Sequence, residues 1–390
     1  MVAPTPFFGD RGCHIRIYEE IRALDDNGVR VLLTTYPAGK DIAGVELRRQ
    51  RFGSFLSREK IGPDAGKFLL DAGLFVSSYR EAREFKPDII HGHLHEGCVI
   101  GKLLSVATGR PLVFDYQGSL SGEMSHHGFL SEGSLGFAFF RKLEKFIDGL
   151  PNAVFTSSTA MSIRAAGGGR GRWFFIPDAI DTDMFKPMGR DDALAKLLGL
   201  PPDKPVCVFL GLLNRYQGAD LLIKSISSMK NRYGDVVHFL IMGYPDVDHY
   251  EEIAAHSSVR DCVTFTGRVA YEDAPRYLCL GDFAAAPKIA TTESNGKVVD
   301  YMACGLPTVA LDTAVNRELM GDAGYYVKWD GSESRAAQPL ADAFVRMAEN
   351  TDLRGNLGNA GRERVMRRFC REELGRALMD AYGRVLEKRR

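Results

Sequence analysis

The stretch TESNGKVVDYMACG, residues 292–305, places two carboxylates, Glu293 and Asp300, seven residues apart with Lys297 between them. An α-helix drifts by only about 20° over seven residues, so two such side chains share one face two turns apart. The spacing predicts a helix near 296–304, with Glu293 at or just before its start. Because the first N–H groups of a helix are unpaired and attract anions, a ligand with both hydroxyl groups and phosphates would match this stretch.

The length and composition are those of a globular protein with two domains. A chain of 390 residues is too long for one ordinary core. Its 50 basic and 50 acidic residues balance, so no bulk field recruits nucleic acid. The seven cysteines lack C-x-x-C spacing, which favours a reducing compartment over a zinc site or a disulfide framework. No apolar run approaches the roughly 20 residues that span a bilayer and no signal peptide leads, so we expect a cytoplasmic protein.

Short apolar runs alternate with amphipathic stretches, a pattern that predicts parallel sheets covered on both faces. In the first half we predict strands near 30–34, 88–91, 111–114 and 153–156, and helices near 13–26, 66–85, 97–107, 136–149 and 158–166. In the second half we predict strands near 206–210, 237–242, 262–266, 282–286, 307–311 and 325–327. The helices of that half are expected near 218–231, 249–256, 272–280, 296–304, 336–349 and 352–368.

Three segments mark the limits of these two series. The opening MVAPTPFFGDRG is typical of the end of a shortened strand followed by a glycine loop. The segment 173–187, rich in Pro and Asp toward its end, is the best candidate for a domain boundary. The last 30 residues hold 10 Lys/Arg and 5 Asp/Glu. A solvated helix face explains that charge better than a lipid-facing one, because the segment has few apolar residues.

Five stretches follow one another in an order that is characteristic of one family. They are PFFGDRGCHIRIYEEIRALDDNGVRVLLTTY (6–36), PDIIHGHLHEG (87–97), FFIPDAIDTDMFKP (174–187), GLLNRYQGADLLIKSI (211–226) and ESNGKVVDYMACGLPTVA (293–310). Together they resemble glycosyltransferase family 4, the retaining GT-B enzymes, over nearly the whole chain. The last stretch is similar to the E-x7-E signature of that family.

The resemblance implies an α/β GT-B fold, in which two Rossmann-like domains face a central cleft. Residues 1–180 would form the acceptor domain, 181–365 the nucleotide-sugar donor domain, and 366–390 a helix that crosses back to the first domain. It also implies transfer of a sugar, with retention of configuration, from a nucleotide-diphosphate sugar to a glycan, lipid or small-molecule acceptor. The donor is a co-substrate, and the family generally needs no metal and no further cofactor.

The resemblance assigns roles to individual residues. Glu293 would contact the sugar hydroxyls and Asp300 the ribose, while the backbone of Ser294, Asn295 and Gly296 would cap the diphosphate. The remaining donor-side positions are Gly9 and Gly12 in the first glycine loop, Gly211 after the first strand of the second half, and Arg268 and Val269 where the family holds the base. Gly9 and Gly12 fit an ordinary turn equally well.

The sequence departs from the family pattern at the phosphate site. The family usually has an Arg and a Lys where this chain has Leu212 and Gln217. Burying a diphosphate without compensating charge is prohibitive, so we predict that Lys297 is the replacement cation. The other candidates are Lys288 and Arg215.

The acceptor side also departs from the pattern, since Gln117 stands where many members carry a histidine. His91, His93 and His95 alternate and would share one face of a strand. We expect His93 and His95 to position the acceptor or donor and His91 to pack in the interior. A metal site is disfavoured, because neither a carboxylate nor a cysteine cluster in the sequence completes it. The D-x-D triplets at 181–183 and 246–248 are expected to be caps or turns.

Three alternatives stay open. A non-catalytic GT-B subunit that only binds nucleotide sugars would explain the missing cations. A nicotinamide-dependent enzyme is disfavoured, because no G-x-G-x-x-G follows a strand. In 136–150, Phe137, Phe140 and Phe146 beside basic residues allow peripheral contact with the inner face of the cell membrane. A helix that faces the core explains that spacing more often.

Overall fold

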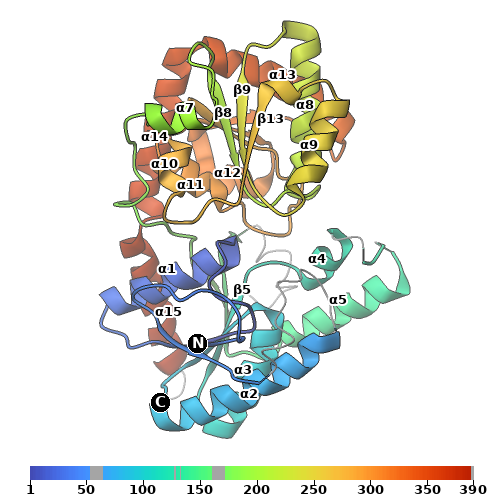
Figure 1. Cartoon of the computed structure of the whole chain (residues 1–390). Coiled ribbons are helices and arrows are strands. Elements are labelled where there is room, and N and C mark those ends of the chain that lie inside the picture. Colours follow the sequence, from blue (N-terminus) through green and yellow to red (C-terminus); the bar gives the residue numbers. More distant parts are fainter. Residues whose placement is uncertain (53–64, 127–128, 132, 160–171, 388–390) are drawn as a thin grey trace. The chain divides into compact units, whose positions relative to one another are not determined.

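The computed structural model describes residues 1–52, 65–126, 129–131, 133–159 and 172–387 (Figure 1). The chain divides into two compact units. The first consists of Met1–Ala179, Thr292–Ser294 and Arg371–Arg390, and the second of Ile180–Thr291 and Asn295–Cys370. The helix predicted near 158–166 lies almost entirely outside the described residues.

The first unit contains a sheet of seven parallel strands in the order β3-β2-β1-β4-β5-β6-β7. The strands are β1 (Val2–Ala3), β2 (Leu32–Thr35), β3 (Glu46–Arg49), β4 (Ile90–His93), β5 (Leu112–Tyr116), β6 (Ala153–Thr156) and β7 (Trp173–Phe175). The predicted short first strand is confirmed, since β1 has two residues. Strands β3 and β7 were not predicted.

Helices cover both faces of this sheet, as expected for a parallel sheet. They are α1 (Gly12–Asp26), α2 (Ala65–Phe85), α3 (Leu94–Thr108), α4 (Leu120–His126), α5 (Leu135–Asp148) and α15 (Arg371–Glu387). One core cluster joins α2, α3 and α5 to the sheet, and it includes Leu74, Leu104 and Phe114. A second cluster on the opposite face joins α1 and α15 through Leu24 and Leu378. The apolar side of the basic C-terminal helix is therefore buried in the first unit.

The second unit repeats the same topology with six parallel strands in the order β10-β9-β8-β11-β12-β13. They are β8 (Val206–Leu210), β9 (His238–Met242), β10 (Val263–Gly267), β11 (Phe283–Ala286), β12 (Thr308–Leu311) and β13 (Gly324–Val327). The helices are α7 (Asp192–Leu197), α8 (Ala219–Tyr233), α9 (Val247–His256), α10 (Ala274–Leu278), α11 (Lys297–Ala303), α12 (Ala314–Met320), α13 (Glu333–Glu349) and α14 (Thr351–Arg368).

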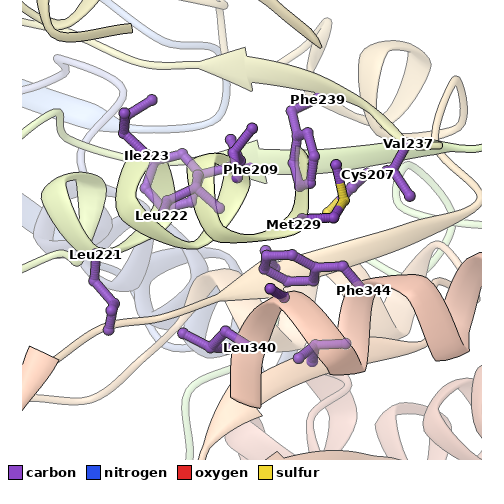
Figure 2. Packing of buried hydrophobic residues seen from close by; sticks show 14 of the residues in the cluster. Cys207, Phe209, Leu221, Leu222, Ile223, Met229, Val237, Phe239, Leu340 and Phe344 are labelled. Atoms are coloured by element: carbon purple, nitrogen blue, oxygen red, sulfur yellow. The ribbon is translucent and has the colours of Figure 1, made fainter. Parts of the chain in front are cut away.

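The core of the second unit lies between this sheet and α8 with α13. Figure 2 shows Phe344 and Leu340 of α13 on the same side of the sheet as Phe209 of β8 and Phe239 of β9. The rings of Phe239 and Phe344 meet edge to face with centroids 5.3 Å apart, an arrangement that stabilises beyond simple burial. This packing fixes β8, and with it the loop that follows β8.

Each sheet has one position where the strand order reverses. It lies between β1 and β4 in the first sheet and between β8 and β11 in the second. Ligands of such sheets bind outside the carboxyl ends of the strands at this position. The candidate ligand-binding segments are therefore those that follow β1, β4, β8 and β11.

The D-x-D triplets behave as predicted. The carboxylate of Asp181 accepts hydrogen bonds from the backbone N–H groups of Asp183 and Met184, each over 3.0 Å. Asp246 is the N-cap residue of α9. Asp181 thus organises a turn, whereas Asp246 occupies the N-cap position without a side-chain capping bond.

Candidate functional site

Lys297 and Gly211 meet at the reversal point of the second sheet. Gly211 directly follows β8 and has φ +152°, and a Cβ placed on it would lie 2.5 Å from Nζ of Lys297. The ammonium also lies 4.3 Å from the centre of the Phe209 ring. A side chain at position 211 would occupy the place of the lysine head, so the glycine lets Lys297 reach over the end of β8.

The head group of Lys297 is buried in the part of the chain that the structure describes. Its Nζ has no hydrogen-bond partner there. Lys288, two residues after β11, is only 4% exposed. Burial first, and then the charge of Lys288, lowers the pKa of Lys297 to about 7, although Asp300 opposes the shift. The charge of Lys288 thus disfavours the charge of Lys297, and an anion bound beside Lys297 would oppose that effect.

Arg215, the third candidate cation, points to a different partner. Its side chain is 76% exposed and lies 2.7 Å from the carboxylate of Glu333, which Lys224 also contacts. Arg268 follows β10 and lies over the ring of Tyr244, 5.0 Å from its centre, with Val269 beside it. Of the three candidate cations, Lys297 has a buried Nζ and Lys288 a buried side chain, whereas Arg215 is exposed.

Glu293 does not share a helical face with Asp300, so that prediction is wrong. Helix α11 begins at Lys297, and Glu293 instead forms an isolated antiparallel bridge with Gly118. A Cβ at Gly118 would lie 2.8 Å from Cγ of Glu293. The pairing with a segment remote in sequence holds residues 292–294 in an extended loop before the helix.

The residues between Glu293 and α11 are held by side-chain hydrogen bonds. Ser294 donates from its hydroxyl to the carboxylate of Asp178. Asn295 is buried and donates to the side-chain oxygen of Asn316 over 2.9 Å. Gly296 is the N-cap residue of α11. Ser294 and Asn295 are thus each held by a side-chain hydrogen bond just before α11 begins.

In the first unit a buried ion network surrounds Arg16 of α1. Its guanidinium donates to Asp115 of β5 over 2.9 Å and to Asp178 over 2.8 Å, and it lies 3.1 Å from Glu20. It also donates to the carbonyl oxygen of Ile176 over 3.3 Å. One cation thus fastens α1 to the end of β5 and to the segment that leads out of the sheet.

Asp115 joins this network to two of the predicted acceptor-side residues. It accepts from Nδ1 of His93 over 3.0 Å and from the side-chain amide of Gln117 over 2.6 Å. Burial raises the pKa of Asp115, but Arg16 and His93 outweigh it and hold this pKa below its usual range. Burial lowers the pKa of His93, although Asp115 opposes the shift, and this favours the neutral imidazole. With Nδ1–H directed to Asp115, Nε2 of His93 is the acceptor nitrogen.

His95 lies apart from this pair, in the first turn of α3. Its ring packs edge-on against Phe114 and Tyr116, with centroids 5.3 and 5.4 Å away. Its Nε2 lies 3.8 Å from Asp148 of α5. Burial lowers the pKa of His95. The structure therefore brings His93 and Gln117 together and leaves His95 in the packing between α3, β5 and α5.

His91 is packed in the interior, where it lies close to two other residues that could bind a metal ion. Its Nδ1 lies 2.7 Å from the Tyr382 hydroxyl, and its ring stacks on His93 at 4.4 Å. A ligand atom from each of Glu20, His91 and His93 lies within 4.8 Å of the others. The expectation that no carboxylate completes a histidine site is therefore wrong. The guanidinium of Arg16 beside Glu20 nevertheless opposes a cation at this position.

The glycine loop after β1 is closed by His14. Nδ1 of His14 accepts from the backbone N–H of Gly9 over 2.8 Å, and Nε2 lies 2.6 Å from the hydroxyl of Thr5. A Cβ at Gly9 would lie 3.2 Å from the His14 ring, whereas one at Gly12 would meet no atom within 4 Å. The folded chain thus limits side-chain size at Gly9 and leaves space around Gly12.

Helix α5 exposes several apolar side chains. Of the three phenylalanines that we expected to face the core, Phe137 and Phe140 are partly buried and Phe146 is exposed. Leu135, Phe139 and Phe146 are 91%, 63% and 65% exposed. They fall on one stripe of the helix, beside exposed Lys142 and Lys145. The residues of α5 that are buried include Glu144 and Ile147. Among the described residues, none of the helices has the length and apolarity that crossing a bilayer demands.

Sequence reasoning missed the polar residues that organise the first unit. These are Arg16, Glu20, Asp115, Asp178 and Tyr382. Arg16 and Glu20 are spaced i, i+4 on a helix that otherwise reads as a surface helix, and Asp115 interrupts an apolar strand run. A charged residue inside a predicted buried strand is a signal of a paired interior charge.

Sequence profiles of two families match the chain. The profile described as "Glycosyl transferase 4-like domain" matches residues 11–178, and "Glycosyl transferases group 1" matches residues 204–350. The first match falls in the first unit and the second match in the second unit. Each unit therefore has its own relatives within the same group of proteins.

Curated relatives agree with the profiles. The GDP-mannose-dependent alpha-(1-6)-phosphatidylinositol monomannoside mannosyltransferase of Mycobacterium tuberculosis H37Rv is 26% identical over 245 residues, which cover 61% of this chain and 63% of that protein. The D-inositol 3-phosphate glycosyltransferase of Xylanimonas cellulosilytica is 29% identical, over 58% of this chain and 55% of that protein. The chain thus spans between half and two thirds of the length of these two relatives.

Solved structures with the same fold cover nearly the whole chain. Sucrose-phosphate synthase from Thermosynechococcus elongatus has a TM-score of 0.82 at 18% identity, over 99% of this chain and 98% of that chain. HepE from Anabaena in complex with UDP and glucose has a TM-score of 0.78 at 17% identity, over 98% of both chains. With both profiles, the ordered motifs and the two reversed parallel sheets in agreement, the chain belongs to glycosyltransferase family 4 and has the GT-B fold.

Proposed function

We propose that this protein transfers a sugar from a nucleotide-diphosphate sugar to an acceptor with retention of configuration. The observation that carries the proposal is the pair of buried lysines at the reversal point of the second sheet, Lys297 and Lys288, where a diphosphate would be neutralised. The names of the relatives support it, since one is a GDP-mannose-dependent mannosyltransferase and another is a D-inositol 3-phosphate glycosyltransferase.

The other donor-side roles follow the family pattern. Asp300 would bond the ribose hydroxyls, the backbone of 294–296 would cap the diphosphate, and Glu293 would contact the sugar. Arg268 and Val269 would hold the base, and Gly9, Gly12 and Gly211 would let backbone approach the ligand closely. His93, with Gln117, would position the acceptor, and His95 would support them. The donor is a co-substrate, and the proposal includes no metal and no further cofactor.

The protein's contribution to the chemistry would be positioning and charge stabilisation. The bond between the sugar and the diphosphate breaks, and a bond forms between the same carbon and the acceptor oxygen. The proton of the acceptor hydroxyl passes to the departing diphosphate on the same face. In this scheme no strong protein base is needed, and Lys297 is useful because negative charge grows on the diphosphate as it leaves.

Two alternatives are less well supported. A non-catalytic binding subunit would explain the loss of the usual cations at Leu212 and Gln217. Under our proposal Lys297 and Lys288 would replace those cations, and the curated relatives are named as transferases. A nicotinamide-dependent enzyme lacks support, because the loops after β1 and β8 have no G-x-G-x-x-G.

The test of the function is the release of nucleotide from UDP-, GDP- and ADP-sugars, with and without cell-lipid or glycan extract. We expect one donor to release nucleoside diphosphate at a rate that rises when the acceptor extract is added. The anomeric configuration of the product, measured by NMR, is expected to match that of the donor. Tight binding of a nucleotide sugar without turnover in any extract would favour the binding subunit instead.

We further propose that the acceptor side contacts an anionic membrane surface peripherally. Besides the stripe on α5, exposed apolar side chains lie on α2 (Phe68, Leu69, Val76) and on α3 (Val99, Leu103, Val106). Helix α3 packs against both α2 and α5. Apolar side chains flanked by Lys142 and Lys145 are typical of a helix that lies in a lipid interface. A lipid-linked acceptor would be presented there.

The membrane proposal predicts a loss of vesicle binding on Phe139→Ser with Phe146→Ser. We expect the affinity for phosphatidylglycerol vesicles to fall by about tenfold or more, since each change removes a large side chain from the lipid. Lys142→Gln with Lys145→Gln should weaken binding mainly at low salt. Leu197→Ser, at an exposed position on α7 in the second unit, is the matched control. Equal sedimentation of all four proteins with vesicles would contradict the proposal.

A further inference from the structure

Lys297 differs from an ordinary phosphate-binding lysine in its surroundings. Its Nζ is buried, lacks a hydrogen-bond acceptor in the described part of the chain, and lies against an aromatic ring and a glycine. A lysine that is withdrawn from water and placed near a second lysine favours its neutral form. In the ligand-free protein, the charged form of Lys297 is therefore disfavoured relative to an exposed lysine.

The charged groups around Lys297 come from α11, from the segments after β8 and β11, and from the neighbouring helices α12 and α14. On α11 itself Asp300 favours the ammonium, and after β11 Lys288 opposes it. Helix α14 packs on α11, and the guanidinium of its Arg362 donates hydrogen bonds to the carbonyl oxygens of Phe185 and Ala303. In the loop after β8, Arg215 is paired with Glu333.

The remaining neighbours add no compensating carboxylate among the described residues. Arg317 of α12 pairs over 2.7 Å with Asp312, which follows β12. The neutral amide of Asn316, also on α12, bonds to Asn295. Asp300 is therefore the carboxylate that acts on Lys297, and the balance of burial, Lys288 and Asp300 lowers its pKa to about 7.

We propose that Lys297 is charged by its ligand: binding of a nucleoside diphosphate brings one proton from solvent onto Nζ of Lys297. This inference rests on the proposed function, because it names the response of the donor site to its own ligand. The diphosphate supplies the acceptor oxygens and the negative charge that the folded chain withholds. The N–H bond forms at Nζ, the buffer gives up the proton, and no other bond changes.

The proposal fixes the sign of the pH dependence. Below about pH 7 Lys297 is already protonated, so ligand binding takes up little additional proton. Above that pH the free protein has lost the proton and must regain it to bind, so affinity falls by up to about tenfold per pH unit. The terminal phosphate of UDP or GDP has its last pKa at about 6 and is ionised above pH 7, so the loss of affinity at higher pH belongs to the protein.

The experiment is calorimetry of UDP and GDP binding to the full chain at pH 8, in HEPES and in Tris, whose ionisation enthalpies differ. For the wild type we expect an uptake approaching one proton per bound diphosphate. Lys297→Arg should bind without uptake, because guanidinium stays charged. Lys297→Met should bind at least about tenfold more weakly, also without uptake. Lys196→Met, an exposed lysine on α7, is the control and should behave as the wild type.

Each outcome has a separate meaning. Diphosphate binding with no proton uptake, or with the same uptake in Lys297→Met, overturns the inference and leaves the proposed function standing. Absence of binding to either diphosphate overturns the proposed function. A direct measurement on the ligand-free protein then decides the charge of Lys297: NMR of lysine labelled at the ε-carbon, assigned with Lys297→Arg, should show one lysine titrating near pH 7. Titration of every lysine above about pH 9 would contradict the proposal.

Discussion

Replacement of Arg16 by methionine is expected to destabilise the first unit by about 3–5 kcal/mol, the cost of removing one partner from a buried ion network. Arg16 is the cation shared by Asp115, Asp178 and Glu20. Methionine fills a similar length but leaves these carboxylates without their counter-charge. Burial and Asp115 already raise the pKa of Glu20 well above its usual value, and losing Arg16 should raise it further.

The measurement uses the two tryptophans of the chain, since Trp173 belongs to the first unit and Trp329 to the second. In a Trp329→Phe background, urea unfolding followed by fluorescence reports on β7 and its neighbours. Arg384→Met, which removes an exposed arginine paired with Asp380 on α15, is the control and should change stability by less than about 0.5 kcal/mol. Equal midpoints for Arg16→Met and Arg384→Met would show that the buried network contributes no net stability.

Replacement of Glu293 by glutamine is expected to lower kcat/KM for the active donor by about 10²–10³, the typical effect of losing one preorganised polar contact to the reacting group. Under the proposed function Glu293 contacts the sugar and not the nucleotide. Affinity for the free nucleoside diphosphate should therefore change little. Glutamine keeps the size of the side chain, so the bridge between residue 293 and Gly118 should persist.

Turnover is measured by nucleotide release and affinity by calorimetry, with Glu363→Gln as the matched control. Glu363 is an exposed glutamate on α14 that pairs with Arg367, and its loss should leave both quantities unchanged. Normal turnover in Glu293→Gln would remove this residue from the site. A parallel loss of diphosphate affinity would place it at the phosphates instead of the sugar.

The regular parts of the fold could be predicted because local patterns determine them. The strands β6 and β8 begin and end where the apolar runs 153–156 and 206–210 predicted. Strand β3 has the sequence ELRR, which carries no apolar alternation. It is an edge strand held by its pairing with β2, and pairing of this kind is not visible in a local pattern.

The candidate site also has some parts that local sequence predicts and others that depend on tertiary contacts. The place of Lys297 at the start of an apolar helix could be predicted from the local sequence. The bridge of Glu293 could not, because it depends on Gly118, far away in the sequence. The periodicity of 292–305 gave the wrong geometry, because a tertiary contact holds residue 293 outside the helix. Phe137, Phe140 and Phe146 have the spacing that predicted a core-facing helix. Only the packing of α5 shows that Phe146 is exposed.

The short segment Thr292–Ser294 has a practical consequence for protein engineering. It belongs to the first unit, although the residues on both sides of it belong to the second. A hybrid enzyme made by joining halves of two family members at residue 180 would therefore place a foreign tripeptide against Gly118 and Asp178. To exchange donor specificity between such proteins, residues 292–294 and 371–390 should come from the same parent as the rest of the first unit.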